Sequence, residues 1–185
     1  MTGTFKISYN ILVKSKLLRR RPFYVKNDCT LFSATGTTKQ VAQTLAKQLG
    51  ADLAEIHPVK PYTSTDLNWH DESTRATVEQ KQEHDGRVPI KDDLPDLTPY
   101  DNVIIGHPIW WGIPPRLIAA TIDKLDLNGK VLATFGTSGS SGYDRAQANI
   151  ARTVQENDYQ LDLQSGDVLN SPAKLNAWLD SISLK

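Results

Sequence analysis

The sequence has little cysteine and no long apolar run. Its 185 residues include one cysteine, Cys29, which cannot form a disulfide within the chain and favours a reducing compartment such as the cytoplasm. We expect that thiol to behave as a small buried hydrophobe. No stretch approaches the roughly 18 apolar residues that a membrane-spanning helix requires. The prediction is therefore a cytoplasmic protein without a membrane span.

Several motifs of nucleotide binding and catalysis are also missing. The sequence has no G-x-x-x-x-G-K-[ST] phosphate loop and no G-x-G-x-x-G fingerprint, because Gly136, Gly139 and Gly142 are spaced three apart. It has no H-E-x-x-H run, no paired-cysteine metal site and no nucleophile elbow. These absences argue against a nucleoside triphosphate site and against a hydrolase, and they predict no metal site.

The charge is balanced overall but unevenly distributed. The chain has 21 basic and 21 acidic residues, yet residues 1–27 carry seven bases and no acid. Residues 28–185 therefore carry 14 basic and 21 acidic residues, a net charge of −7. An acidic globular body favours partner proteins with basic surfaces through long-range attraction, and it disfavours nucleic acid.

Residues 1–27 are expected to form a basic extension ahead of one globular domain over residues 28–185. Between Phe5 and Val13, apolar residues alternate with others, which predicts a half-buried strand. Basic residues follow from Leu17 to Arg21, the reverse of the order in a cleavable secretory signal. We interpret the segment as a solvated extension, with a basic surface patch as the alternative. The remaining length suits one core.

The rest of the sequence alternates expected strands and helices. Continuous apolar runs at 29–32, 103–106 and 131–135 are typical of strands that are covered on both faces. The first run is short, because Asn27 and Asp28 precede it. Further strands are expected at 51–56 and 159–163 and helices at 38–49, 66–82, 114–125, 143–156 and from 172, with a connection over 85–100.

This order predicts an α/β fold, a doubly wound three-layer sandwich with a five-stranded parallel sheet. Right-handed crossovers leave few strand orders, and one of them is 2-1-3-4-5. In that order strands one and three are neighbours at the topological switch point. Ligands of such folds bind there, beyond the carboxyl ends of the strands.

Three loops follow the strands that meet at this point. The first, S-A-T-G-T-T (33–38), offers hydroxyls and helix N-terminal amides that suit a phosphate, although ordinary helix capping uses the same residue types. The second, P-I-W-W-G (108–112), offers two indoles that could equally anchor a core. The third, G-T-S-G-S-S-G-Y-D (136–144), would alone pass as a flexible linker. Together they suit a ligand with a phosphate at one end and a flat ring at the other.

The three loops resemble those of the flavodoxin family. The first is similar to the flavodoxin phosphate signature T-x-T-G-x-T, with Ser33 in place of the first threonine. The second and third look like the two loops that enclose the isoalloxazine ring in flavodoxin-like proteins. The resemblance covers about residues 29–185. It implies a flavodoxin fold that holds one non-covalent FMN.

The resemblance also implies which residues hold the cofactor. Hydroxyls and amides of the first loop would bind the phosphate, one tryptophan, preferably Trp110, would pack on the ring, and Gly112 would let a peptide turn toward the flavin N5. The third loop would meet the pyrimidine edge, and Tyr143 the ring. The predicted set is Ser33, Ala34, Thr35, Gly36, Thr37, Thr38, Pro108, Trp110, Trp111, Gly112, Thr137, Ser138, Gly139 and Tyr143. We expect no catalytic side chain, because the flavin performs the chemistry.

Three functions stay open from the sequence. The first is an FMN-binding electron-transfer protein that exchanges electrons with basic redox partner proteins. The alternative is an FMN-dependent NAD(P)H:quinone-type oxidoreductase in which Trp110, Trp111 and His107 line a substrate pocket, although a histidine after a buried strand is more often structural. The third is a module that has kept the fold and binds no flavin.

Overall fold

The computed structural model describes residues 25–81 and 85–185, so the predicted strand between residues 5 and 13 lies outside the described residues. Its elements follow one another as β1 (Asn27–Leu31), α1 (Thr37–Leu49), β2 (Asp52–Glu55), α2 (Arg75–Lys81), β3 (Asn102–Pro108), α3 (Arg116–Lys124), β4 (Val131–Thr137), α4 (Asp144–Glu156), β5 (Asp162–Leu163), β6 (Asp167–Val168) and α5 (Pro172–Ser181). Within these two ranges, no helix has both the length and the apolar surface needed to cross a bilayer.

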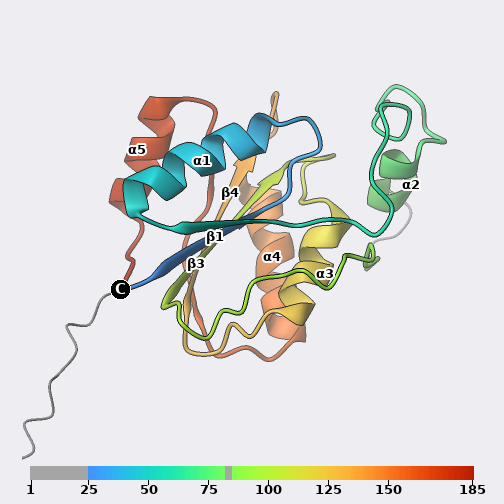
Figure 1. Cartoon of the computed structure of the whole chain (residues 1–185). Helices are drawn as coiled ribbons and strands as arrows, with labels where there is room; N and C mark the ends of the chain where they lie inside the picture. The colour runs from blue at the N-terminus through green and yellow to red at the C-terminus, as the bar shows by residue number, and fades with distance from the viewer. Residues whose placement is uncertain (1–24, 82–84) are drawn as a thin grey trace, which may run out of the picture.

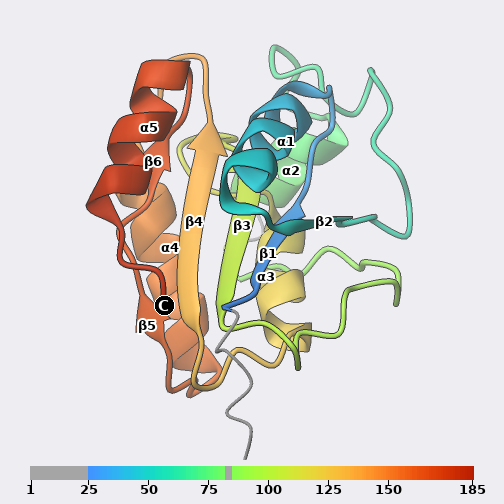
Figure 2. The same cartoon turned by 60° about the vertical axis from the view of Figure 1, so that its left-hand side comes forward.

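The strands form one parallel sheet in the order β2-β1-β3-β4-β5. Helices α1 and α5 cover one face, and α3 and α4 cover the other (Figures 1 and 2). Apolar side chains fill both layers; Cys29 and Trp178, for example, lie in the layer of α1 and α5, and Ile105 and Ile150 in the layer of α3 and α4. The predicted doubly wound three-layer fold and its strand order are confirmed.

The edge beside β4 differs from the prediction. In place of one strand over 159–163, β5 covers Asp162–Leu163, and a second short strand, β6, pairs with β4 farther along, at Phe135 and Gly136. Tyr159 is not in the strand, because its backbone N–H donates to the Val154 carbonyl of α4 at 3.3 Å. Its hydroxyl donates to the carbonyls of Ile122 and Leu125 at 3.1 and 2.7 Å. The sheet thus has a sixth strand, which the alternating pattern did not indicate.

Strand β1 begins earlier than its apolar run. Asn27 and Asp28 pair with β3, and Asp28 also pairs with Asp52 of β2, so the strand is not shortened at this end. The side chain of Asp28 is buried, and the Thr30 hydroxyl donates to its carboxylate at 2.6 Å. A local hydroxyl donor therefore lets a carboxyl group occupy the interior of the sheet.

Helix α2 is shorter than the predicted helix over 66–82. The residues before it form turns, in which the Asp66 carboxylate accepts from the Thr63 N–H at 2.8 Å and the Asp71 carboxylate accepts from the Ser73 N–H at 2.9 Å. Such local side-chain bonds give the backbone an alternative to helical hydrogen bonds. The helix therefore begins only at Arg75.

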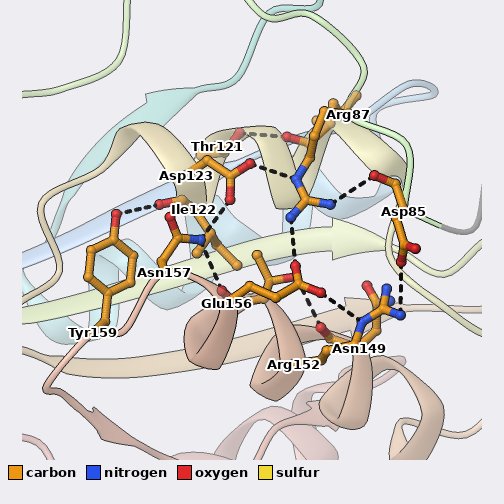
Figure 3. A network of polar contacts seen from close by, with 12 residues as sticks. Asp85, Arg87, Thr121, Ile122, Asp123, Asn149, Arg152, Glu156, Asn157 and Tyr159 are labelled. Atoms are coloured by element: carbon orange, nitrogen blue, oxygen red, sulfur yellow. Dashed lines mark hydrogen bonds and ion pairs between the residues drawn. The ribbon is translucent and has the colours of Figure 1, made fainter.

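The connection over 85–100 is tied to the helices on its side of the sheet. Arg87 donates to the carboxylates of Asp123 and Glu156 at 2.6 and 2.9 Å, which joins the connection to α3 and α4 (Figure 3). Arg152 of α4 pairs with Asp85 at 3.0 Å. The predicted connection is thus present, and ion pairs anchor it.

Candidate functional site

A cavity of about 750 Å³ opens beyond the carboxyl ends of β1, β3 and β4. It lies at the switch point between β1 and β3, where ligands of doubly wound folds bind. Two other hollows, of about 410 and 520 Å³, lie away from this edge of the sheet. The residues lining the cavity are Ala34, Thr35, Thr37, Thr38, Leu67, Trp69, Ala76, Pro108, Ile109, Trp110, Trp111, Thr137, Ser138, Gly139, Ser140, Ser141 and Asn170. The structure therefore brings the three predicted loops together.

The first loop turns at Gly36, whose φ of +90° lies in the left-handed region that favours glycine. The hydroxyl of Ser33 accepts a hydrogen bond from the Gly36 N–H at 3.1 Å. The Gly36 carbonyl then accepts from the Gln40 N–H at 3.1 Å, so the N–H groups of residues 37–39 precede the helical ladder. Ser33 and Gly36 shape the turn without lining the cavity, and the turn leaves helix N-terminal amides for an anion.

The threonine hydroxyls of this loop fall into two groups. Thr35 and Thr37 are exposed on the cavity, with their hydroxyls 3.4 Å apart. Thr38 is buried, and its hydroxyl lies 2.8 Å from that of Thr137 in the third loop. Lys39 forms an ion pair with Glu55 of β2. Thr35 and Thr37 are thus free to meet an anion, whereas Thr38 joins two walls of the cavity.

The second loop contains a two-residue turn between Trp110 and Ile113, whose backbone groups bond each other at 2.9 and 3.2 Å. The central residues, Trp111 and Gly112, have φ values of +51° and +85°, as in a type I′ turn. A bulky residue rarely adopts a positive φ, and such strain is found mainly at functional sites. The turn places both indoles on the cavity wall, while Gly112 is buried beside the guanidinium group of Arg145.

Trp110 is held by an aromatic cluster behind it. Its ring meets those of Phe32 and Tyr62 edge to face, with centroid distances of 5.9 and 5.1 Å. The Gln80 amide of α2 donates to the Trp110 carbonyl at 3.0 Å, and the Arg75 guanidinium lies 4.1 Å from the centroid of the Tyr62 ring. Trp110 is therefore both a core anchor and a fixed wall of the cavity.

Tyr143 and His107 lie beneath the cavity and do not line it. Both side chains are buried, and the Tyr143 hydroxyl donates to His107 Nε2 at 3.0 Å, because Nδ1 of that ring donates to the Pro108 carbonyl at 2.9 Å. Burial lowers the pKa of His107 to about 4, so the ring is neutral near pH 7. The predicted ring contact of Tyr143 and the pocket role of His107 do not fit these positions. Both residues support the loops from below.

Four residues of the cavity wall lie outside the three predicted loops. Leu67, Trp69 and Ala76 come from the connection between β2 and β3, and Asn170 follows β6. The Asn170 side chain accepts a hydrogen bond from the Ser138 N–H at 3.4 Å. Asn170 lies at the same sheet edge as the three loops, so a correct prediction of β6 would have indicated it. No periodic signal places the connection over the cavity.

Comparison with known proteins places the chain in a family. The flavodoxin family model matches residues 26–182. The chain belongs to the flavodoxin family. Flavodoxin 1 of Escherichia coli (strain K12) is 23% identical over 128 residues, covering 67% of this chain and 56% of its own length. A flavodoxin of Klebsiella pneumoniae matches to the same extent. The chain thus spans little more than half the length of these curated relatives.

Solved structures share the fold of this flavodoxin-family protein. A candidate flavoprotein of Bacteroides eggerthii is 37% identical, with a TM-score of 0.78 over 86% of this chain and 99% of that one. A second, from Bacteroides uniformis, is 33% identical, with a TM-score of 0.72 over 84% and 98%. A flavoprotein of Lactobacillus acidophilus in complex with FMN is 21% identical, with a TM-score of 0.65 over 84% and 99%, a likeness of fold alone.

Proposed function

We propose that this flavodoxin-family protein binds one FMN in the 750 Å³ cavity and acts in electron transfer. One observation carries the proposal: two different turns line the same cavity. One turn carries hydroxyl groups at the N-terminus of α1, and the other carries two tryptophans. The first suits a phosphate and the second a flat ring. The flavoprotein of Lactobacillus acidophilus, which shares the fold, was solved with FMN.

The donor set fits the cofactor. Thr35 and Thr37 would bind the phosphate through their hydroxyls, together with the N–H groups at the start of α1. Trp110 would flank the ring, and the backbone from Thr137 to Gly139 would meet its polar edge. FMN, when bound, supplies one-electron and two-electron chemistry. The chain would contribute a fixed surround that orients the ring.

The acidic body of the protein supports electron exchange with partners whose surfaces are basic, because residues 28–185 carry a net charge of −7. A second candidate function is reduction of a small acceptor, as in an NAD(P)H:quinone-type oxidoreductase. One observation favours it. The cavity has an apolar wall, Leu67, Trp69 and Ala76, that belongs to none of the three loops assigned to FMN.

The phosphate assignment is tested by titrating FMN and riboflavin, which lacks the phosphate, into the purified chain. We expect Thr35→Ala combined with Thr37→Ala to weaken FMN by at least tenfold, because each lost hydrogen bond to a charged group is worth about 1.5–3 kcal/mol. Riboflavin affinity should stay unchanged. Thr44→Ala, an exposed threonine of the same helix that does not line the cavity, is the matched control.

A further variant distinguishes the role of Thr38 from that of Thr35 and Thr37. Thr38→Val should weaken both ligands, since the Thr38 hydroxyl holds the third loop through Thr137. Equal losses of FMN and riboflavin in the Thr35 and Thr37 variant would refute the phosphate site. A wild-type protein that takes up no FMN would refute the proposed function as a whole.

A further inference from the structure

One wall of the cavity has no part in holding FMN as assigned above. Leu67, Trp69 and Ala76 come from the connection between β2 and β3, which reaches past the arrowheads of the sheet (Figure 2). Trp69 is 65% exposed, more than Val59 at 59% or any other large hydrophobic side chain of the described residues. An indole left in water on a cavity wall costs hydrophobic free energy that an apolar ligand would recover.

Trp69 is fixed before any ligand arrives. The carbonyl of Asn68 accepts from the Asp71 N–H and from the Thr74 hydroxyl, both at 3.1 Å, and the Asn68 side chain accepts from the His70 N–H at 3.3 Å. The His70 ring stacks on the indole with a centroid distance of 3.5 Å and a tilt of 34°. Hydrogen bonds on both sides of Trp69 thus hold the backbone, and a preorganised ring loses little entropy on binding.

The lining selects against a second phosphorylated ligand. The described residues that line the cavity are apolar or carry hydroxyl or amide groups, and none has a formal charge. Of the nearby cations, Lys39 pairs with Glu55 and Arg75 with Glu79, while the Arg145 guanidinium lies beside Gly112 and does not line the cavity. The amides at the start of α1 would accommodate one phosphate, that of FMN in the proposed function. A dinucleotide would need further cationic partners for its phosphates, so the wall at Trp69 suits an uncharged flat ring.

We propose that a quinone-class ring binds against Trp69, between Leu67 and Ala76, and accepts electrons from the FMN site. The inference rests on the proposed function and names the acceptor for it. The quinone takes up two electrons and two protons and leaves as the hydroquinone. A bound, reduced FMN would supply those two electrons and two protons, so the exchange is balanced without a third reactant.

The test uses the full chain loaded with FMN and duroquinone as the probe, because its ring has no free position for reaction with a thiol. The protein is reduced with dithionite under argon and mixed with increasing duroquinone. Trp69→Ala should raise the half-saturating duroquinone concentration about tenfold, the loss expected for one aromatic stacking contact, and leave the limiting rate and the FMN affinity unchanged. Calorimetric titration of duroquinone into the oxidised, FMN-loaded protein should show the same loss without turnover.

Two further variants test whether the loss of affinity comes from the aromatic ring of Trp69. Trp69→Phe should restore most of the duroquinone affinity, because a phenyl ring still stacks. Val59→Ala, which shortens an exposed apolar side chain that does not line the cavity, should change the affinity for neither FMN nor duroquinone. An equal loss of FMN and duroquinone in Trp69→Ala would mean that the indole covers the cofactor, and would overturn the inference.

The remaining outcomes are also decisive. Unchanged duroquinone affinity in Trp69→Ala overturns the inference, as does a wild-type protein that takes up FMN and fails to bind duroquinone; both leave the proposed function intact. A wild-type protein that takes up no FMN overturns the proposed function and the inference together.

Discussion

Asp28 is a carboxyl group in the interior of the sheet, 1% exposed. Burial raises its pKa from 3.8 to about 6, and the neighbouring carboxylate of Asp52 adds to this, although the Thr30 hydroxyl bond acts in the opposite direction. The folded protein therefore holds this proton more tightly than the unfolded chain does. The resulting stabilisation is complete below about pH 4 and is lost as the pH rises through 6.

Asp28→Asn should remove this pH dependence. An amide stays neutral, and its oxygen can still accept the hydrogen bond from Thr30. We expect the variant to be more stable than the wild type by about 3 kcal/mol at pH 8 and by about half of that at pH 5. Urea unfolding at the two pH values measures the difference. Asp96→Asn, at an exposed carboxyl group whose pKa is lowered by its bonds to Thr98, is the control and should shift both values alike. If wild type and Asp28→Asn differed in stability by the same amount at both pH values, the raised pKa of Asp28 would be contradicted.

The sequence predicts which kinds of side chain gather at the cavity, but it does not predict which residues they bond. The sequence indicates that hydroxyls gather near the start of α1, and the structure places them there. It cannot indicate that Ser33 bonds its own loop or that Thr38 bonds Thr137, 99 residues away. Tyr143 follows the right strand for a ring contact, yet its hydroxyl points to buried His107. Such partners depend on how distant loops pack.

At the scale of elements, the central strands were predictable and the connection before β3 was not. Continuous apolar runs identify β3 and β4 because both faces of these strands are covered. The stretch before α2 has few apolar residues, and short polar side chains there can either cap the backbone or face solvent in a helix. In the structure these side chains bond the backbone, as Asp71 does, and the resulting turns place Trp69 on the cavity wall.

Arg87 is expected to be the main polar anchor of the connection over 85–100. It bonds Asp123 of α3 and Glu156 of α4, so its loss leaves two carboxylates without this partner (Figure 3). We expect Arg87→Met to lower the free energy of unfolding by about 1–2 kcal/mol, since each partly exposed pair contributes up to about 1 kcal/mol. In this variant, amide hydrogen exchange should accelerate relative to the wild type more around Val88, whose side chain lies in the core, than in the rest of the chain.

The matched control is Lys124→Met, which removes one isolated pair with Asp92, a residue whose side chain is 92% exposed. We expect that variant to change stability by less than about 0.5 kcal/mol. Equal effects of the two substitutions would mean that Arg87 acts as an ordinary surface charge and that the apolar contacts of Val88 hold the connection in place.

At the scale of the whole molecule, the fold follows from the order of elements, while the full outline of the cavity does not. Alternating strands and helices with right-handed crossovers leave the observed strand order as one of few, and that order fixes which loops meet. The fourth wall comes from a long connection, whose path is set by side-chain bonds such as that of Gln80 to the Pro114 carbonyl at 3.1 Å. The sequence therefore predicts the three loops that line the cavity better than the wall beside them.

The cavity draws on residues from Ala34 to Asn170, so the whole domain has to be folded for it to exist. A ligand that binds only the folded state at 100 times its Kd stabilises that state by about 2.7 kcal/mol. For a chain of this length, that corresponds to a rise in Tm of about 6–10 °C. We expect calorimetry of the full chain to show one transition that moves by this amount with FMN and by less with an equal concentration of riboflavin. Thr44→Ala should keep the full shift, and the double variant of Thr35 and Thr37 should show only the riboflavin shift. A second transition that FMN leaves in place would mean that part of the domain folds without forming the cavity.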